Sequence, residues 1–387
     1  MPRLDHSLTI AVLAASVCLA AFGLRRRKVS GVVADGIDQC IGNTPLVKVH
    51  SLSRATGCEI YAKLELANPG GSAKDRVALA IIRKNEKNGV IKPGRGDTIF
   101  EGTSGSTGIS FAMLCDSLGY KAHICLPSDT SEEKLQLLES FGAIIEKVKP
   151  ASIVDPNQYV NAARRGAEVM SQDPSSTSVG VFADQFENDS NWRIHYTTTG
   201  PEIWNQLQGK LDYFVTGSGT GGTIAGCARF FKEQKRKVQV FLADPQGSGL
   251  YNRIKHGVMF DTVEKEGTRR RHQVDTVIEG IGLNRVTHNF HMGESFIDDS
   301  VRVLDEEAMK MASYLCRNDG LFLGSSSCIN AVGVLKLIKE GVIPESSTVC
   351  FIACDSGNRH LSKFWLEARL YKDIELDDII TSAVHKL

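Results

Sequence analysis

The sequence lacks both an excess of charge and a paired spacing of its cysteines. Lysine plus arginine and aspartate plus glutamate each number 45, so the formal net charge is zero and no nucleic-acid-binding surface is expected. The ten cysteines include no CxxC motif and no Cys/His array with the spacing of a zinc site. We therefore expect reduced, mostly buried thiols in a reducing compartment, and no metal site.

Other signatures are missing too. The chain has no internal repeat, no low-complexity run and no G-x-S-x-G elbow that would present a serine nucleophile. Its 387 residues, 42% hydrophobic and 23% charged, have the composition of an ordinary globular protein with roughly two domains.

A long, uncharged and apolar run lies near the N-terminus. Residues 8–24 carry no charge, and their number is near the lower limit for a membrane-spanning helix. The basic cluster Arg25–Lys28 follows this run, whereas a secretory signal peptide carries its charge before the apolar stretch. Because basic flanks stay on the cytosolic side, residues 1–34 are predicted to be a retained anchor and linker, with the rest of the chain in the cytosol. The run resembles anchors of the mitochondrial outer membrane; an endoplasmic-reticulum anchor and a cleaved presequence stay open.

Beyond residue 34, predicted strands and helices alternate. This order predicts an α/β fold of two open, mostly parallel sheets with helices on their faces. The strands are expected at 59–64, 97–101, 121–126, 143–148, 179–182, 211–215, 238–243 and 348–353, and the helices at 72–88, 107–118, 131–141, 200–207, 224–232, 305–319 and 329–339.

The segment Asn68–Arg76 places Lys74 in the first turn of a helix, directly after a polar loop. Ser72 is the predicted N-cap and Asp75 its capping-box partner. A cation is disfavoured by the helix dipole at this end, so Lys74 needs a reason to be there. A lysine with a lowered pKa can attack a carbonyl. A solvated, charged helix start explains the segment equally well.

Two strand-to-helix turns combine hydroxyl groups with glycine, at the place where open α/β sheets bind ligands. The turn Thr103–Gly108 suits a carboxylate or phosphate at a helix N-terminus, although a capped tight turn would look similar. The turn Thr216–Thr223 is dense in glycine, which lets backbone amides close around a phosphate, and we identify no structural need for that density. It also fits G-x-G-x-x-G, and with Asp244 after the next strand it allows a nucleotide-dependent oxidoreductase as an alternative. A third turn, Gly324–Cys328, is a hydroxyl cluster or a plain helix cap.

Taken together and in order, these segments resemble the cysteine synthase and cystathionine β-synthase family of pyridoxal-phosphate enzymes, whose fold is shared with the tryptophan synthase β chain. The similarity covers nearly all of residues 35–365 and is greatest to the membrane-anchored mitochondrial cysteine synthases of fungi. The matching segments are 41–46, 68–76, 103–108, 184–188, 194–204, 219–223 and 355–357.

The resemblance implies a role for each candidate residue. Lys74 is the lysine that bonds covalently to pyridoxal phosphate and removes the substrate's α-proton, and Ser326 meets the pyridine nitrogen. The cup for the cofactor phosphate consists of Gly219, Thr220, Gly221, Gly222 and Thr223. The pocket for the substrate carboxylate consists of Thr103, Ser104, Thr107 and Gln185, with Ser106 beside the cofactor's phenolic oxygen.

The resemblance also implies an architecture and a reaction. Residues 68–189 form a smaller, mobile domain, and residues 35–67 plus 190–387 form a larger one, with the cofactor in the cleft between them. The expected reaction forms L-cysteine from O-acetyl-L-serine and sulfide through an α-aminoacrylate intermediate, in a homodimer. Two alternatives stay open: β-elimination by a desulfhydrase or dehydratase, and a catalytically weak, membrane-tethered metabolite binder.

Three departures from the family pattern are expected to border the substrate pocket. Ser106 stands where the family usually has asparagine, Cys328 stands where it usually has glycine, and residues 280–286 lack the usual aromatic-aliphatic-proline continuation. The polar segment 261–275 precedes the last of these and could shape the entrance. These positions bear on the substrate rather than on the chemistry.

Overall fold

The computed structural model describes residues 33–151, 153–234, 238–260 and 276–380. Residues 36–387 form one compact unit, distinct from residues 1–35. The predicted anchor at residues 8–24 and the polar segment 261–275 lie outside the described residues. In the described part of the chain, no helix combines the length and the apolar character that a membrane crossing needs.

The larger sheet has six strands in the order β1-β2-β10-β7-β8-β9. Only the β1–β2 pair is antiparallel, and the other neighbours are parallel, so the sheet is of the predicted open, mostly parallel kind. Its strands are β1 (Leu46–Lys48), β2 (Glu59–Leu64), β7 (Tyr213–Thr216), β8 (Gln239–Pro245), β9 (Asp299–Val303) and β10 (Thr348–Ala353).

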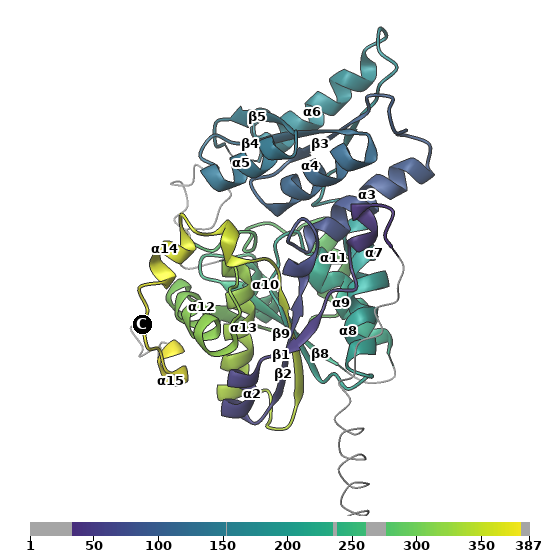
Figure 1. Cartoon of the computed structure of the whole chain (residues 1–387). Coiled ribbons are helices and arrows are strands. Elements are labelled where there is room, and N and C mark those ends of the chain that lie inside the picture. The colour runs from purple at the N-terminus through teal and green to yellow at the C-terminus, as the bar shows by residue number, and fades with distance from the viewer. Residues whose placement is uncertain (1–32, 152, 235–237, 261–275, 381–387) are drawn as a thin grey trace, which may run out of the picture. The chain divides into compact units, whose positions relative to one another are not determined.

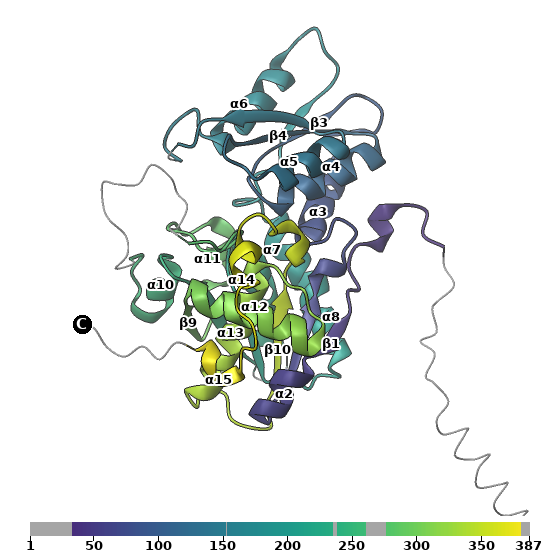
Figure 2. The same cartoon turned by 60° about the vertical axis from the view of Figure 1, so that its left-hand side comes forward.

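Helices cover both faces of this sheet because its strands are apolar on both faces. Val215 and Phe351 point into one core, with α12 (Asp305–Asp319) and α13 (Ser325–Lys339). Their neighbours Phe214 and Ile352 point into the other, with α8 (Gly200–Gln206) and α9 (Gly222–Glu233). Figures 1 and 2 show these layers from two directions.

The smaller sheet has four parallel strands in the order β5-β4-β3-β6. One face packs against α3 (Lys74–Lys87), α4 (Ser106–Leu118) and α5 (Glu132–Ser140). The other packs against α6 (Tyr159–Gln172). The strands are β3 (Thr98–Gly102), β4 (Lys121–Pro127), β5 (Ile144–Val148) and β6 (Gly180–Phe182).

The predicted elements are present, with ends shifted by a few residues, and further elements join them. The α/β class with parallel-rich sheets is therefore confirmed, while the domain division at residues 68–189 stays a prediction. The short additional elements are η1 (Ile37–Cys40), α2 (His50–Thr56), η2 (Glu65–Ala67), α7 (Ser190–Ile194), the π-helical turn η3 (His195–Thr199), α10 (Leu250–His256), α11 (His288–Glu294), η4 (Gly357–Arg359), α14 (Phe364–Ala368) and α15 (Leu376–Ile379).

Candidate active site

A cavity of about 310 Å³ lies where the carboxyl ends of strands from both sheets meet. This is the edge at which open α/β sheets bind ligands, and the volume is in the range of small-molecule pockets. All the predicted site residues except Gly222 line it: Lys74, Thr103, Ser104, Ser106, Thr107, Gln185, Gly219, Thr220, Gly221, Thr223 and Ser326. The structure thus brings together segments that are far apart in the sequence.

Lys74 is the first residue of α3, so the helix begins one residue later than a Ser72 cap would require. The predicted capping box is wrong: the residue at the N-cap is Ala73, and no side chain caps the helix. Ser72 Oγ does accept a hydrogen bond from the Lys74 N–H at 3.2 Å. Asp75 turns away, because its carboxylate accepts from the Gly70 N–H at 2.6 Å and from Ser110 Oγ at 2.5 Å. Asp75 therefore braces the loop before Lys74 instead of capping the helix.

The Lys74 amine faces the cavity. Burial lowers its pKa, against the opposing charges of Cys354 and Asp355. Within the described residues, its Nζ has no hydrogen-bond or ion-pair partner. A larger share of the amine is therefore neutral than in water, and a neutral amine is the nucleophilic and basic form.

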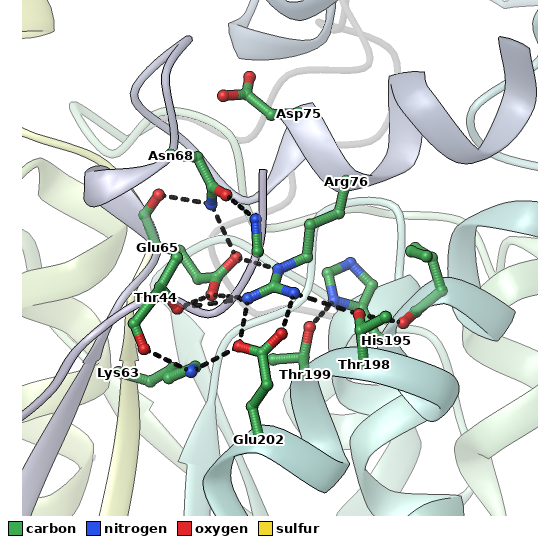
Figure 3. Close-up of polar contacts among 12 residues, drawn as sticks. Thr44, Lys63, Glu65, Asn68, Asp75, Arg76, His195, Thr198, Thr199 and Glu202 are labelled. Atoms are coloured by element: carbon green, nitrogen blue, oxygen red, sulfur yellow. Dashed lines mark hydrogen bonds and ion pairs between the residues drawn. The ribbon is translucent and has the colours of Figure 1, made fainter. Parts of the chain in front are cut away.

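Two residues after Lys74 and outside the cavity wall, the Arg76 guanidinium is clamped between two carboxylates (Figure 3). It donates to both oxygens of Glu65, at 2.8 Å each, and to both oxygens of Glu202, at 2.6 and 2.8 Å. Burial alone would raise the pKa of Glu202, but the Arg76 hydrogen bonds outweigh it and hold that pKa at about 2. Two bidentate pairs fix α3 two residues beyond Lys74.

Neighbouring residues complete this buried network, which we call the charged floor: Thr44, Lys63, Glu65, Asn68, Arg76 and Glu202. Thr44 Oγ1 donates to Glu65 at 2.7 Å, and Asn68 Nδ2 donates to the same carboxylate at 3.1 Å. The fully buried Lys63 donates to Glu202 at 2.7 Å and to the Thr44 carbonyl at 2.8 Å. The charged floor was not predicted from the sequence, although Thr44, Asn68 and Glu202 lie in three of the matching segments.

The glycine-rich turn after β7 forms the opposite wall. Its glycine density does have a structural reason, contrary to the expectation from sequence. A Cβ on Gly219 would lie 2.1 Å from the Gly280 carbonyl oxygen, and one on Gly221, which has φ +88°, would lie 2.5 Å from Phe290 N. Gly222 packs against Asn191 and does not line the cavity. The same glycines are therefore needed for two reasons: they allow this close packing, and they leave the backbone amides of the turn uncovered by side chains.

Thr223 links this wall to a buried histidine. Its Oγ1 lies 3.2 Å from His195 Nε2, and His195 Nδ1 lies 2.9 Å from Thr199 Oγ1. Burial, with the charges of Arg76 and Lys74, lowers the His195 pKa to about 3 against the pull of Glu65. The imidazole is therefore neutral, and the Thr223 hydroxyl has a fixed partner behind it.

The hydroxyl turn after β3 is held from below by a buried glutamate. Thr107 Oγ1 donates to Gln185 Oε1 at 2.5 Å, and Gln185 Nε2 donates to Glu101 at 3.0 Å. Burial raises the Glu101 pKa to about 8. Thr103 Oγ1 accepts from the Gly105 N–H at 3.1 Å, so the turn is shaped before any ligand arrives.

Two of the departures line the cavity and one does not. Ser106 and the stretch Gly280–Leu283 do, together with Arg285. Cys328 is fully buried in the core formed with α12 and α13 and is absent from the cavity wall. The expectation that it borders the pocket is wrong: it lies two residues beyond Ser326 on α13, and the helical twist turns it toward the core.

At the cavity mouth, Glu279 connects the two sheets. Its carboxylate pairs with Lys134 of α5 at 2.8 Å and lies 3.2 Å from His360 Nδ1. His360 Nε2 lies 3.1 Å from Asp355. Burial would lower the His360 pKa, but the two carboxylates raise it to about 9. His360 is therefore an imidazolium between two carboxylates at neutral pH.

Two groups of acidic and thiol residues lie outside the cavity wall. Asp244, which the nucleotide alternative needs, is fully buried and accepts from the Tyr251 N–H at 2.7 Å, so it braces α10. His123, Cys125 and Glu146 lie within 4.8 Å of one another and bond internally, His123 to Glu146 at 3.0 Å and Cys125 to Glu146 at 3.5 Å. Sequence spacing did not reveal this cluster because it joins β4 to β5.

The residues around the cavity define a class of site. A lysine amine with a lowered pKa suits an aldehyde, the amide-lined turn at the start of α9 suits a phosphate, and the Ser326 hydroxyl suits a ring nitrogen. A phosphorylated aldehyde cofactor fits this set. The chain belongs to the pyridoxal-phosphate dependent enzyme family, whose model matches residues 37–355.

Similar proteins narrow the family further. A Saccharomyces cerevisiae protein named "Putative mitochondrial cysteine synthase" is 61% identical over 89% of this chain and 88% of its own. Cysteine synthase 2 of Neurospora crassa is 56% identical over 86% of this chain and 73% of its own, and that of Schizosaccharomyces pombe is 53% identical over 88% and 86%. The crystal structure of O-ureido-L-serine synthase has a TM-score of 0.73 and 27% identity, covering 89% of this chain and 98% of that one.

Proposed function

We propose that this enzyme forms L-cysteine from O-acetyl-L-serine and sulfide, releasing acetate, by β-replacement. The observation that carries the proposal is one cavity lined by Lys74, the glycine- and threonine-rich turn, the hydroxyl turn and Ser326. The cysteine synthases described above, 53 to 61% identical to this chain, support the choice of reaction.

Each wall has a distinct task in this proposal. Residues Gly219–Thr223 hold the cofactor phosphate, and Ser326 faces the pyridine nitrogen. When bound, pyridoxal phosphate supplies an electron sink for negative charge at the substrate's α-carbon. A hydroxyl at the ring nitrogen does not hold it protonated as a carboxylate would, which favours loss of the β-substituent over transamination.

Lys74 moves the proton. Its neutral Nζ accepts a proton from the substrate's α-carbon, and it returns a proton there after the sulfur has added at the β-carbon. Thr103, Ser104, Thr107 and Gln185 orient the substrate by its carboxylate. The charged floor keeps the start of α3, and with it the Lys74 amine, in register with these groups.

The reaction is tested by product analysis of the purified full-length protein. We expect L-cysteine and acetate from O-acetyl-L-serine and sulfide, and a loss of at least about a thousandfold in rate for Lys74→Ala. Lys87→Ala, at the exposed end of the same helix, is the matched control and should keep the full rate. If pyruvate dominates even with sulfide present, the β-replacement proposal fails and β-elimination replaces it.

We further propose that residues 1–34 anchor the protein in the mitochondrial outer membrane, with the catalytic part in the cytosol and the enzyme a homodimer. The uncharged run at 8–24, the basic cluster after it and the mitochondrial name of the yeast relative support the location. Protease added to intact mitochondria should remove the catalytic part, and alkaline extraction should leave the anchor in the membrane fraction. Protection from the protease, or release by alkali, contradicts this topology.

A further inference from the structure

Ser106 is held by a cation from another part of the chain. It is the first residue of α4, and its hydroxyl is at the cavity wall. Arg359, at the end of η4, donates from Nη1 to Ser106 Oγ at 3.0 Å. Since Ser106 Oγ accepts this bond, its own proton stays available to donate. The part of the chain that the structure describes offers that proton no other side chain.

The positive charge of Arg359 is only partly balanced by its surroundings. No carboxylate within the described residues lies in ion-pair range of it, and Asp355 and Asp75 act on it only through their charge, against the burial that lowers its pKa. Its guanidinium packs against the loop before Lys74, where a Cβ on Gly71 would lie 3.0 Å from Nη2. One cation therefore touches the loops that carry Lys74 and Ser106.

The turn that Arg359 supports has donors but no formal charge, because residues 103–108 are threonine, serine and glycine only. Besides Lys74, the cations at the cavity wall are engaged elsewhere: Lys134 and Lys363 face Glu279, at 2.8 and 3.5 Å, and Arg285 pairs with Glu187 at 2.9 Å. Of the described cations, Arg359 is the one hydrogen-bonded to a side chain of the hydroxyl turn.

We propose that Ser106 donates to the substrate's carboxylate, with Thr103, Ser104 and Thr107 of the same turn, and not to the cofactor's phenolic oxygen as the resemblance implies. Arg359 is then a positioning residue that sets the affinity for that carboxylate through the Ser106 hydroxyl. A hydroxyl that accepts from a guanidinium is a stronger donor, since hydrogen bonds in a chain polarise one another, and bonds to an ionised partner are shorter and stronger. Arg359 thereby brings a positive charge next to Ser106, on a turn that has no charged residue of its own. The inference rests on the proposed function for the carboxylate pocket but not on the identity of the sulfur nucleophile.

The test compares two ligands that differ only in the carboxylate. L-alanine and L-alaninamide lack a leaving group, and their binding to the cofactor-loaded, full-length protein is measured by the change in cofactor absorption. Arg359→Gln should weaken L-alanine by about tenfold or more, the usual size for a hydrogen bond to a charged group, and L-alaninamide by less than about twofold. Arg359→Lys should restore part of the difference.

A double-mutant comparison distinguishes an effect of Arg359 that acts through Ser106 from a purely structural effect of Arg359. Ser106→Ala should lose a similar factor for L-alanine, and adding Arg359→Gln to it should change little more, because the two act in series. For O-acetyl-L-serine, Arg359→Gln should raise KM with kcat changed much less. Arg83→Gln, an exposed arginine of α3 paired with Asp38 and Glu86, is the matched control and should alter neither ligand.

Equal weakening of both ligands, or independent effects of the two substitutions, overturns the proposal. The outcome is separable from that of the proposed function, because L-alanine binding requires no cysteine synthesis. A protein that discriminates the ligands through Arg359 but makes no cysteine keeps this inference and loses the reaction. A protein that fails to bind the cofactor, seen before any ligand is added, overturns both.

Discussion

Helix α3 begins with two cations, Lys74 and Arg76, that serve two different regions. Lys74 faces the cavity without a partner among the described residues, whereas Arg76 reaches into the charged floor and binds both Glu65 and Glu202 through two bonds each. The Lys74 amine has no partner and is therefore reactive, whereas the Arg76 guanidinium has its hydrogen bonds satisfied and is therefore fixed. The reactivity of Lys74 depends on the ion pairs of Arg76, because an unpaired amine keeps its position only on a rigid support.

Removing Arg76 should produce the largest effect on stability. Arg76→Met leaves two buried carboxylates without their cation, and breaking such a buried pair typically costs about 3–5 kcal/mol. Urea unfolding of the variant measures this change in the free energy of unfolding. Arg83→Met, at an exposed position of the same helix, should cost less than about 1 kcal/mol. Equal losses for the two variants would show that the charged floor contributes no more to stability than an exposed ion pair.

The cavity mouth should respond to pH between 6.5 and 9, whereas the lowered pKa of Glu202 makes the charged floor respond in the acid range. The His360 pKa is raised from 6.5 to about 9, so its contribution is complete below pH 6.5 and is lost as the pH rises through 9. The contribution is about 3 kcal/mol. His360→Gln should flatten the dependence of unfolding free energy on pH between 6.5 and 9. A variant as steep as the parent in this window would place the titration elsewhere.

Lys134→Met should have a smaller effect, because its partner Glu279 keeps His360 and Lys363 as cationic neighbours. We expect a loss of about 1 kcal/mol or less, shrinking when salt is added. Unfolding measured at low and high ionic strength checks this. A loss as large as that of Arg76→Met would contradict the distinction between the mouth and the charged floor.

Lys74→Ala should have the smallest effect on stability although it has the largest effect on the reaction. Its amine has no partner to lose, and burial already disfavours its charge. Without added cofactor, the free energy of unfolding should stay within about 0.5 kcal/mol of the parent, measured alongside Arg76→Met. A large loss would mean that Lys74, like Arg76, has a structural role.

Much of the fold was predictable because its strands and helices differ in period and length. Strand Glu59–Leu64 and helix Asp305–Asp319 have the predicted ends. The short strand β9 and the helix α6 were not predicted, since β9 begins with the polar pair Asp299–Ser300 and α6 follows a polar loop. The start of α3 was misplaced because Asp75 finds better donors in Gly70 and Ser110 than in a capping box.

The candidate site was predictable as a list of residues but not as a set of contacts. Local motifs marked the segments of Lys74, Thr220 and Ser326, the family resemblance supplied their roles, and the structure places them at one cavity. No sequence pattern pairs Arg359 with Ser106, because 253 positions separate them. The position of Cys328 was also wrongly predicted, because whether a helical residue faces a cavity or a core depends on what packs on the helix.

Lys74 is the residue that we propose to carry the cofactor. Reduction of the full-length protein with borohydride in the presence of pyridoxal phosphate, followed by peptide mapping by mass spectrometry, tests it directly. We expect one cofactor-sized mass increase, on the peptide that contains Lys74; Lys74→Ala should lose it and the control Lys87→Ala should keep it. Attachment at another lysine, or none at all, would contradict the account.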